Sequence, residues 1–173
     1  AREYGFTAVH AMTADMSAVS GALSGLTRNG QPFNSSALMD GGSLGAAFRL
    51  RDTVLPGQAA ALDALAADLI DRFTDPAVDP TLTATTPGLF TDAGARRDPL
   101  DSTGLSSRLA VNAAVDPARG GALWHLRDGI GATSAGPVGN AARLDAWADA
   151  LGSTAAGASF ADRTASLTAV AGN

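Results

Sequence analysis

The sequence predicts an α+β, mostly helical protein, in which a long kinked central helix packs against C-terminal helices and short β-strands or a hairpin lie near the N-terminus. An apolar side chain recurs every seven residues along the expected helix, which is typical of a buried helical seam. The recurring positions, with two intervening ones, are Phe48, Leu55, Leu62 and Leu69, and Leu44 and Leu65. We therefore expect a β-rich segment over residues 1–40 and a helical core domain over residues 41–173, with a long loop at 75–104.

The N-terminal residues predict two or three short strands. Tyr4, Phe6 and Ala8 alternate with smaller or polar neighbours, and a second β-like stretch covers residues 23–33. The dipeptide Asn29-Gly30 inside that stretch predicts a tight hairpin turn, because both of its central positions need positive φ. Residues 12–23 could instead form a weak helix.

The central helix is expected to begin after Gly41-Gly42, with Ser43 as its N-cap. Pro56 interrupts the pattern, because proline has no amide donor and clashes with the preceding turn. We expect either a kink or two helices, over about 43–53 and 56–74. Asp75-Pro76 then ends the helix.

Turn-forming residues dominate the long loop at 75–104, where Asp-Pro and Pro-Gly pairs recur. One short strand is expected at residues 89–91, and residues 105–112 alternate well enough to be extended and to pair with it. A short helical turn or ordered loop is expected over 121–127, and a small-residue linker over 131–139.

Two helices are expected at the C-terminal end. Asn140 caps the first, which reaches Leu151 and presents Leu144, Trp147 and Leu151 on one apolar face. Ser159 caps the second, which carries Phe160, Leu167 and Val170.

Composition excludes several classes of function. The chain has 173 residues, no cysteine and a formal net charge of -5, so disulfides, zinc-thiolate sites and thiol catalysis are excluded and a nucleic-acid footprint is absent. The adjacent pair Arg96-Arg97 lies between Asp92 and Asp98, which favours local neutralisation over phosphate binding. No apolar run is long enough to span a bilayer, and the first residues of the chain show neither the basic nor the apolar region of a cleavable signal.

No catalytic, cofactor-binding or metal site is expected from the residue pattern. His10 and His125 have no second ligand at metal spacing, and no Gly-x-Ser-x-Gly elbow of a serine hydrolase is present. Ser134 stands where a dinucleotide fingerprint after Gly129-Ile130-Gly131 needs glycine, so that stretch is interpreted as a flexible connector. Arg51-Asp52 and Arg127-Asp128 are expected to form structural ion pairs or helix-end contacts.

Five aspartates in and after the central helix are candidates for catalytic or calcium-binding groups. Asp68 and Asp71 are three residues apart and therefore lie on the same side of the helix. Two catalytic carboxylates could be placed in this way, but the same spacing is also typical of a solvated helix face. The loop from Asp75 to Asp79 lacks the Asp-x-Asp-x-Asp-Gly spacing of a calcium loop. The full cluster is Asp63, Asp68, Asp71, Asp75 and Asp79.

Two stretches together resemble one known family. The first runs from Gly41 to Asp52 with the sequence GGSLGAAFRLRD and continues through Gln58, Leu62, Leu69 and Phe73. The second is SFADRTASL over residues 159–167, in which Thr164 occupies the place of a family tyrosine. In this order they resemble flagellar hook-associated protein 1, the hook-filament junction protein of bacterial flagella.

The resemblance implies a non-enzymatic axial subunit that leaves the cell through the flagellar type III apparatus without a cleavable signal peptide. Its implied partners are identical subunits in a junction ring, the hook protein and a neighbouring hook-associated protein, with no cofactor, nucleic acid or membrane. The family's terminal heptad helices and outer β-domain have no counterpart over residues 1–173, so this segment by itself is expected to be monomeric.

Two other classes of function stay open. One is a secreted or periplasmic hydrolase that uses paired aspartates such as Asp98 and Asp101. A deep cleft with two converging carboxylates would favour this enzyme. The other is a filament protein of the flagellin or hook-associated protein 3 group, for which different residues would be expected at the start of the helix.

Overall fold

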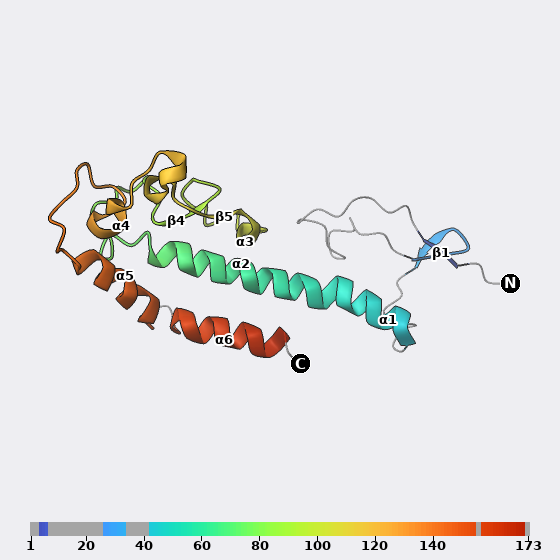
Figure 1. Ribbon diagram of the computed structural model, residues 1–173. Coiled ribbons are helices and arrows are strands. Elements are labelled where there is room, and N and C mark those ends of the chain that lie inside the picture. The colour runs from blue at the N-terminus through green and yellow to red at the C-terminus, as the bar shows by residue number, and fades with distance from the viewer. Residues whose placement is uncertain (1–3, 7–25, 34–41, 155–156, 172–173) are drawn as a thin grey trace. The chain divides into compact units, whose positions relative to one another are not determined.

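The computed structural model describes residues 4–6, 26–33, 42–154 and 157–171, and the chain forms two compact units, Ala1–Ala59 and Ala60–Asn173. The secondary structure is mostly helical with two small antiparallel sheets, so the predicted mostly helical α+β class is confirmed (Figure 1). The expected domain boundary at residues 40–41 stays a prediction, because residues 34–41 lie outside the described part. The weak helix expected over 12–23 and the residue His10 also lie outside it.

The first unit contains a three-stranded antiparallel sheet of β1 (Tyr4–Phe6), β2 (Leu26–Arg28) and β3 (Gln31–Phe33), in that order. Strands β2 and β3 form the predicted hairpin, with Leu26 opposite Phe33. Asn29 and Gly30 have φ values of 52° and 75°, the positive pair that a type I′ turn requires. Strand β1 then pairs with β2, with Tyr4 opposite Arg28.

One helical segment crosses Pro56 without a break, by changing its hydrogen-bond spacing. Helix α1 (Gly42–Arg49) passes into a π-helical turn, η1 (Leu50–Val54), and then into α2 (Leu55–Arg72). In the π-turn, the amide of Leu55 donates to the carbonyl of Leu50, five residues back. Ser43 lies inside the first turn of α1 instead of capping it, since the helix already begins at Gly42.

The seven-residue seam is covered only in its C-terminal part. Leu69 packs against the main core, whereas Leu55 and Leu62 are 55% and 50% exposed and Leu44 is 48% exposed. The expectation that the whole seam packs against the C-terminal helices is therefore wrong for these positions. The residues of α2 that are most buried lie beside the seam, at Asp63, Ala66 and Ile70.

The second unit joins α2 to a small two-stranded sheet and several single helical turns. Strand β4 (Phe90–Asp92) pairs antiparallel with β5 (Leu109–Val111), and α3 (Leu105–Arg108) leads directly into β5. The extended segment expected over 105–112 is thus half helix and half strand. The chain continues through η2 (Ala113–Val115), η3 (Pro117–Arg119) and α4 (Trp124–Asp128).

The Asp-Pro pairs of the long loop and its continuation all use the same turn. In each one, aspartate Oδ1 accepts a hydrogen bond from the amide two residues later, and the intervening proline has no amide to compete. The four donor–acceptor distances lie between 2.8 and 3.0 Å. The four aspartates are Asp75, Asp79, Asp98 and Asp116.

The C-terminal helices are α5 (Ala142–Gly152) and α6 (Phe160–Ala171), and both predicted caps are present. Asn140 Oδ1 accepts from the amide of Ala142 at 3.1 Å, and Ser159 Oγ accepts from the amide of Asp162 at 3.2 Å. On α5 the buried residues are Trp147 and Ala150, while Leu144 and Leu151 are exposed. The predicted apolar face is therefore confirmed at Trp147 and wrong at Leu144 and Leu151, because the buried face is rotated toward Ala150.

The core of the second unit is two hydrophobic clusters that share Phe90. Phe73 is the centre of the first, and its ring lies edge-on to Phe90 at 5.0 Å and tilted to Trp147 at 5.9 Å, both in the range of favourable aromatic pairs. The second cluster packs Ala66 and Ile70 of α2 against Leu105 of α3. The last turns of α2 are thus fixed from two sides.

Candidate functional site

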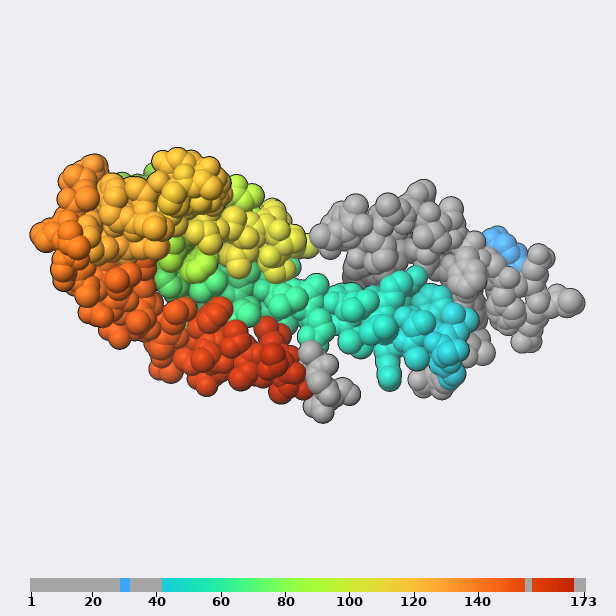
Figure 2. Space-filling model, viewed as in Figure 1, coloured from blue at the N-terminus to red at the C-terminus, as the bar shows by residue number. Residues whose placement is uncertain are grey.

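A groove of about 490 Å³ runs beside α2 in the second unit. Three alanines of α2 form its floor, Ser102 and Thr103 line one side, and Arg163 of α6 lines the other. Figure 2 shows α2 exposed between the yellow segment after residue 100 and the red α6. Three aspartates of α2 also line it, so the partners of Asp63, Asp68 and Asp71 decide its chemistry.

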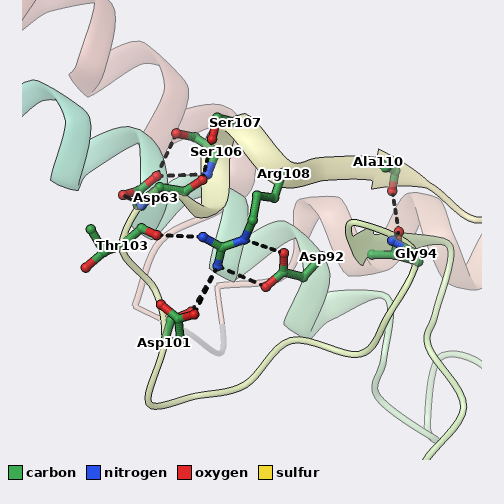
Figure 3. A network of polar contacts seen from close by, with 11 residues as sticks. Asp63, Asp92, Gly94, Asp101, Thr103, Ser106, Ser107, Arg108 and Ala110 are labelled. Carbon is green, nitrogen blue, oxygen red and sulfur yellow. Dashed lines mark hydrogen bonds and ion pairs between the residues drawn. The ribbon is translucent and has the colours of Figure 1, made fainter. Parts of the chain in front are cut away.

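Asp63 binds the N-terminal turn of α3. Its Oδ1 accepts from the amide of Ser106 at 2.8 Å and from Ser106 Oγ at 2.6 Å, and its Oδ2 accepts from the amide of Gly104 at 2.8 Å (Figure 3). A carboxylate is favourable there because the first amides of a helix lack partners within the helix. Asp63, a residue of α2, therefore caps the N-terminus of α3.

These donors also decide the ionisation of Asp63. Burial opposes the charged form, but the hydrogen bonds from Ser106 and Gly104, helped by the charge of Arg108, outweigh it and lower the pKa of Asp63 below its ordinary value. The side chain is only 8% exposed. Asp63 is thus a buried acceptor held in its charged form, unlike a general acid, whose pKa must be raised.

Arg108, the last residue of α3, binds β4 and the loop before α3. Its Nε and Nη2 bind the two carboxylate oxygens of Asp92 at 2.7 and 3.1 Å, and its Nη1 donates to the carbonyl of Thr103 at 2.7 Å (Figure 3). The paired geometry matches the fork of a guanidinium to a carboxylate. Hydrogen bonding to Asp92 is the main cause that raises the pKa of Arg108.

The aspartate pair considered for a hydrolase has other partners in the structure. Asp98 Oδ1 accepts from the amide of Leu100 in its own turn, and Asp101 lies 3.7 Å from Arg108 Nη2. Each carboxylate thus serves a local contact of the loop.

Arg72 joins the end of α2 to both C-terminal helices. Its Nε binds Asp68 Oδ2 at 2.8 Å, and its two Nη atoms donate to the carbonyls of Ala150, Ser153 and Ala158 at 2.7 to 2.8 Å. Arg72 and Asp68 are 7% and 8% exposed at their side chains. The guanidinium thereby supplies donors to carbonyls at the end of α5 and at the start of α6.

Asp68 and Asp71 are both engaged in ion pairs. Asp68 lies 3.6 Å from Arg163 Nε in addition to Arg72, and Asp71 makes a two-point pair with Arg97 at 2.6 and 3.2 Å. The partner of Arg97 is therefore Asp71 of α2, 26 residues earlier in the chain, and the expected neutralisation by its neighbours Asp92 and Asp98 is wrong. Each of the three aspartates in the groove is bound to donors of the same chain.

Asp79 is the most buried carboxylate of the described residues, with no exposed surface. It accepts from the amide and hydroxyl of Thr81 at 3.0 and 2.6 Å and from the amide of Ile130 at 2.8 Å. Arg143 of α5 lies 3.8 Å away. Asp79 therefore holds the start of the long loop to the chain after α4.

The stretch Gly129-Ile130-Gly131 is a tightly packed crossing, and its interpretation as a flexible connector is wrong. A Cβ on Gly131 would lie 2.2 Å from the carbonyl oxygen of Thr81, and one on Gly129 would lie 2.4 Å from Thr81 Oγ1. Ile130 is buried in the main core. Glycine is needed at 131 because the backbone of Thr81 lies against it, and at 129 because the residue has a φ of 113° and the side chains of Thr81 and Asp79 fill the position of a Cβ.

The Arg-Asp neighbours form the expected ion pairs. Arg127 Nη2 lies 2.6 Å from Asp128 Oδ2, and Arg51 and Asp52 are paired in the same way. The hydrogen bond from Arg127, with a second from the amide of Gly136, lowers the pKa of Asp128. Both pairs therefore stabilise local turns.

His125 has structural contacts only, among those that the structure describes. Its ring stacks on Trp124 with centroids 3.7 Å apart, and its Nδ1 lies 3.1 Å from the carbonyl of Gly129. Within the described residues, no group of three or more histidine, aspartate or glutamate side chains could hold a metal ion. None of the helices described here is long and apolar enough to cross a membrane.

Sequence reasoning missed the two residues that organise this region, Arg72 and Arg108. For Arg72 a signal was available, because Asp68 lies four residues earlier and such pairs meet on one helix face. For Arg108 no local signal was available, because Asp92 is 16 residues away.

Comparison with known proteins gives no relative from which a role could be transferred. No protein family model, curated protein sequence or solved structure matches the chain. The class defined by fold and site is thus a mostly helical α+β protein with a groove of paired charges along one helix. Any statement of its function rests on its own residues.

Proposed function

We propose that this chain is part of a structural, non-enzymatic subunit of the bacterial flagellum, a hook-associated protein that joins hook to filament. The resemblance to hook-associated protein 1 motivates the proposal. In this role the protein is exported without a cleavable signal peptide, lies outside the cell, and contacts identical subunits, the hook protein and a neighbouring hook-associated protein.

One observation carries the proposal on the structural side. The end of the first stretch, from Leu62 to Phe73, and the second stretch are about 90 residues apart in sequence but lie in the same compact unit. Arg72 of α2 donates to the carbonyl of Ala158 at 2.8 Å, 86 residues later, and Arg163 of α6 lies 3.6 Å from Asp68. A subunit that bears load at a junction needs its helices fixed to one another. Buried charged hydrogen bonds provide such fixation because they are short and directional.

The groove beside α2 supports the same role. Its three aspartates are occupied by the chain's own amides and guanidinium groups, at distances from 2.6 to 3.6 Å. These contacts connect α2, α3 and α6. We therefore propose that the groove is part of a rigid body whose outer faces meet neighbouring subunits.

Deletion of the gene in the bacterium that encodes it tests this function. The expected cells keep their hooks, lack filaments, do not swim, and release filament protein into the medium as unpolymerised subunits. Antibody labelling in electron microscopy should mark a single band between hook and filament. Normal filaments in the deletion strain would contradict the proposal, and label along the whole filament would favour the filament-protein alternative.

Complementation provides a matched pair of variants. A gene carrying Arg72→Met should restore motility poorly, because the substitution removes the contacts between α2, α5 and α6. Arg96→Met should restore it fully, because Arg96 is exposed and has one long contact, to the carbonyl of Thr86 at 3.4 Å. Equal rescue by the two variants would show that this packing has no part in the function.

A further inference from the structure

The segment around Pro56 combines three features that each weaken a helix. The π-turn at Leu50–Val54 closes five residues back instead of four, Pro56 has no amide to donate to the carbonyl of Asp52, and Gly57 costs helix stability relative to alanine. All three lie within eight consecutive residues. Such a concentration is unusual inside one continuous helical segment, since mid-helix π-turns are rare and often functional.

Tertiary packing does not offset this weakness in the described structure. Neither α1 nor η1 contains a buried residue, whereas α2 buries Asp63, Ala66 and Ile70 from its second half onward. The boundary between the two compact units lies at Ala59–Ala60, two residues after Gly57. Helices in proteins depend on packing for most of their stability, and short isolated ones are marginal.

Two contacts of the π-turn are local. Arg51 pairs with Asp52, its neighbour in the sequence, and its guanidinium carbon lies 4.7 Å above the ring of Phe48. Both side chains of the ion pair are 26% exposed, and ion pairs that water can reach contribute little to stability. They can hold one local geometry without preventing its opening.

We propose that residues 50–57 are a built-in joint, at which α1 and the π-turn open reversibly while α2 beyond Asp63 stays folded. The joint divides one long helical segment into a half that stays folded and a half that opens and closes. Local opening of this kind takes place without global unfolding when few buried contacts cross the opened segment. The inference goes beyond the proposed function and does not depend on it.

Hydrogen–deuterium exchange of the whole chain, read by NMR or by mass spectrometry of overlapping peptides, tests the joint. Amides of residues 44–55 should exchange at least about 100-fold faster than those of residues 63–72, because only the latter need the larger opening. Similar protection in the two stretches would overturn the proposal.

Two substitutions should stiffen the joint. Gly57→Ala meets no atom within 4 Å and should slow exchange of residues 44–55 by about fivefold, the ratio expected from glycine and alanine in a helix. Pro56→Ala restores a donor for the Asp52 carbonyl and should slow it further, by about tenfold or more. Neither should alter the exchange of residues 63–72.

Gly139→Ala is the matched control, because a Cβ there also meets nothing within 4 Å and the residue lies outside every helix. Its exchange at residues 44–55 should equal that of the parent chain. If Pro56→Ala folds poorly, Gly57→Ala alone decides the test. An unchanged exchange rate in Gly57→Ala would refute the joint.

Discussion

Arg72 and Asp68 form a buried ion pair at 2.8 Å in which the arginine uses its remaining donors for three carbonyls at the ends of α5 and α6. The pair thus has two tasks. Asp68 neutralises the guanidinium on α2, and the guanidinium in turn ends one helix and orients the next.

Substitution of Arg72 should therefore be costly. Arg72→Met leaves Asp68 buried beside Arg163 alone and leaves three carbonyls without their donor, so the free energy of unfolding should fall by about 3 to 5 kcal/mol, as for other broken buried pairs. Urea denaturation followed by circular dichroism measures it. Arg96→Met should be nearly neutral, and a similar loss in both variants would contradict the assignment.

Asp63 should give the protein part of its acid sensitivity. Its pKa is lower in the folded chain than in the unfolded one, so it contributes stability that is present above its ordinary pKa of about 4 and is lost as the pH falls through the lowered folded value. Asp63→Asn should lower the free energy of unfolding at pH 7 by about 1 to 3 kcal/mol, because an amide cannot accept from both Gly104 and Ser106 as the carboxylate does.

The pH profile distinguishes this effect from a simple loss of packing. Below about pH 4 the difference in stability between Asp63→Asn and the parent chain should shrink, since the parent loses its charged acceptor. Asp145→Asn, at an exposed position on α5, should follow the parent chain throughout. A difference that stays constant down to pH 2 would argue against the charged cap.

The Asp-Pro turns allow one motif to be compared in two environments. Asp79→Ala removes the acceptor of three donors, one of them fully buried, and should cost about 3 kcal/mol, at roughly 1 to 3 kcal/mol for each unsatisfied buried group. Asp98→Ala removes the same turn bond at an exposed site and should cost well under half as much. Thermal unfolding of both variants measures the contrast, and equal losses would show that burial of Asp79 is not decisive.

Gly131 tests the crossing between Thr81 and the chain after α4. Gly131→Ala would place a methyl group 2.2 Å from a backbone carbonyl, which cannot move aside as a side chain can, so we expect a loss of about 1 to 3 kcal/mol or more. Gly139→Ala should leave the melting temperature unchanged. If Gly131→Ala does not lower the melting temperature, the segments around Thr81 and Gly131 are further apart in solution than in the structure.

Local signals predicted most of the secondary structure. The Asn29-Gly30 hairpin and the caps at Asn140 and Ser159 were found because each depends on neighbouring residues only. The strand at β4 was also expected. Local rules missed α3, where residues that alternate like a strand form a helical turn because Asp63 caps it from another helix.

Apart from the pair of Asp68 and Arg72, which are four residues apart, the charge pairs of the groove were not predictable from local spacing. Arg97 and Asp71 are 26 residues apart in the sequence, and Arg72 and Ala158 are 86 apart, so no local sequence pattern predicts either contact. The apolar faces failed for a related reason. On α5, Trp147 and Ala150 are buried whereas Leu144 and Leu151 are exposed, because the ring of Trp147 packs against Phe73.

The π-turn changes how positions along this helical segment correspond to one another. A turn that closes one residue later than an α-turn rotates everything before it by about 100°, the angle of a single residue. Leu44 and Leu55, which heptad counting assigns to one stripe, therefore cannot be assumed to share a side of the helix. Cross-linking or labelling schemes here should number positions separately before Leu50 and after Val54.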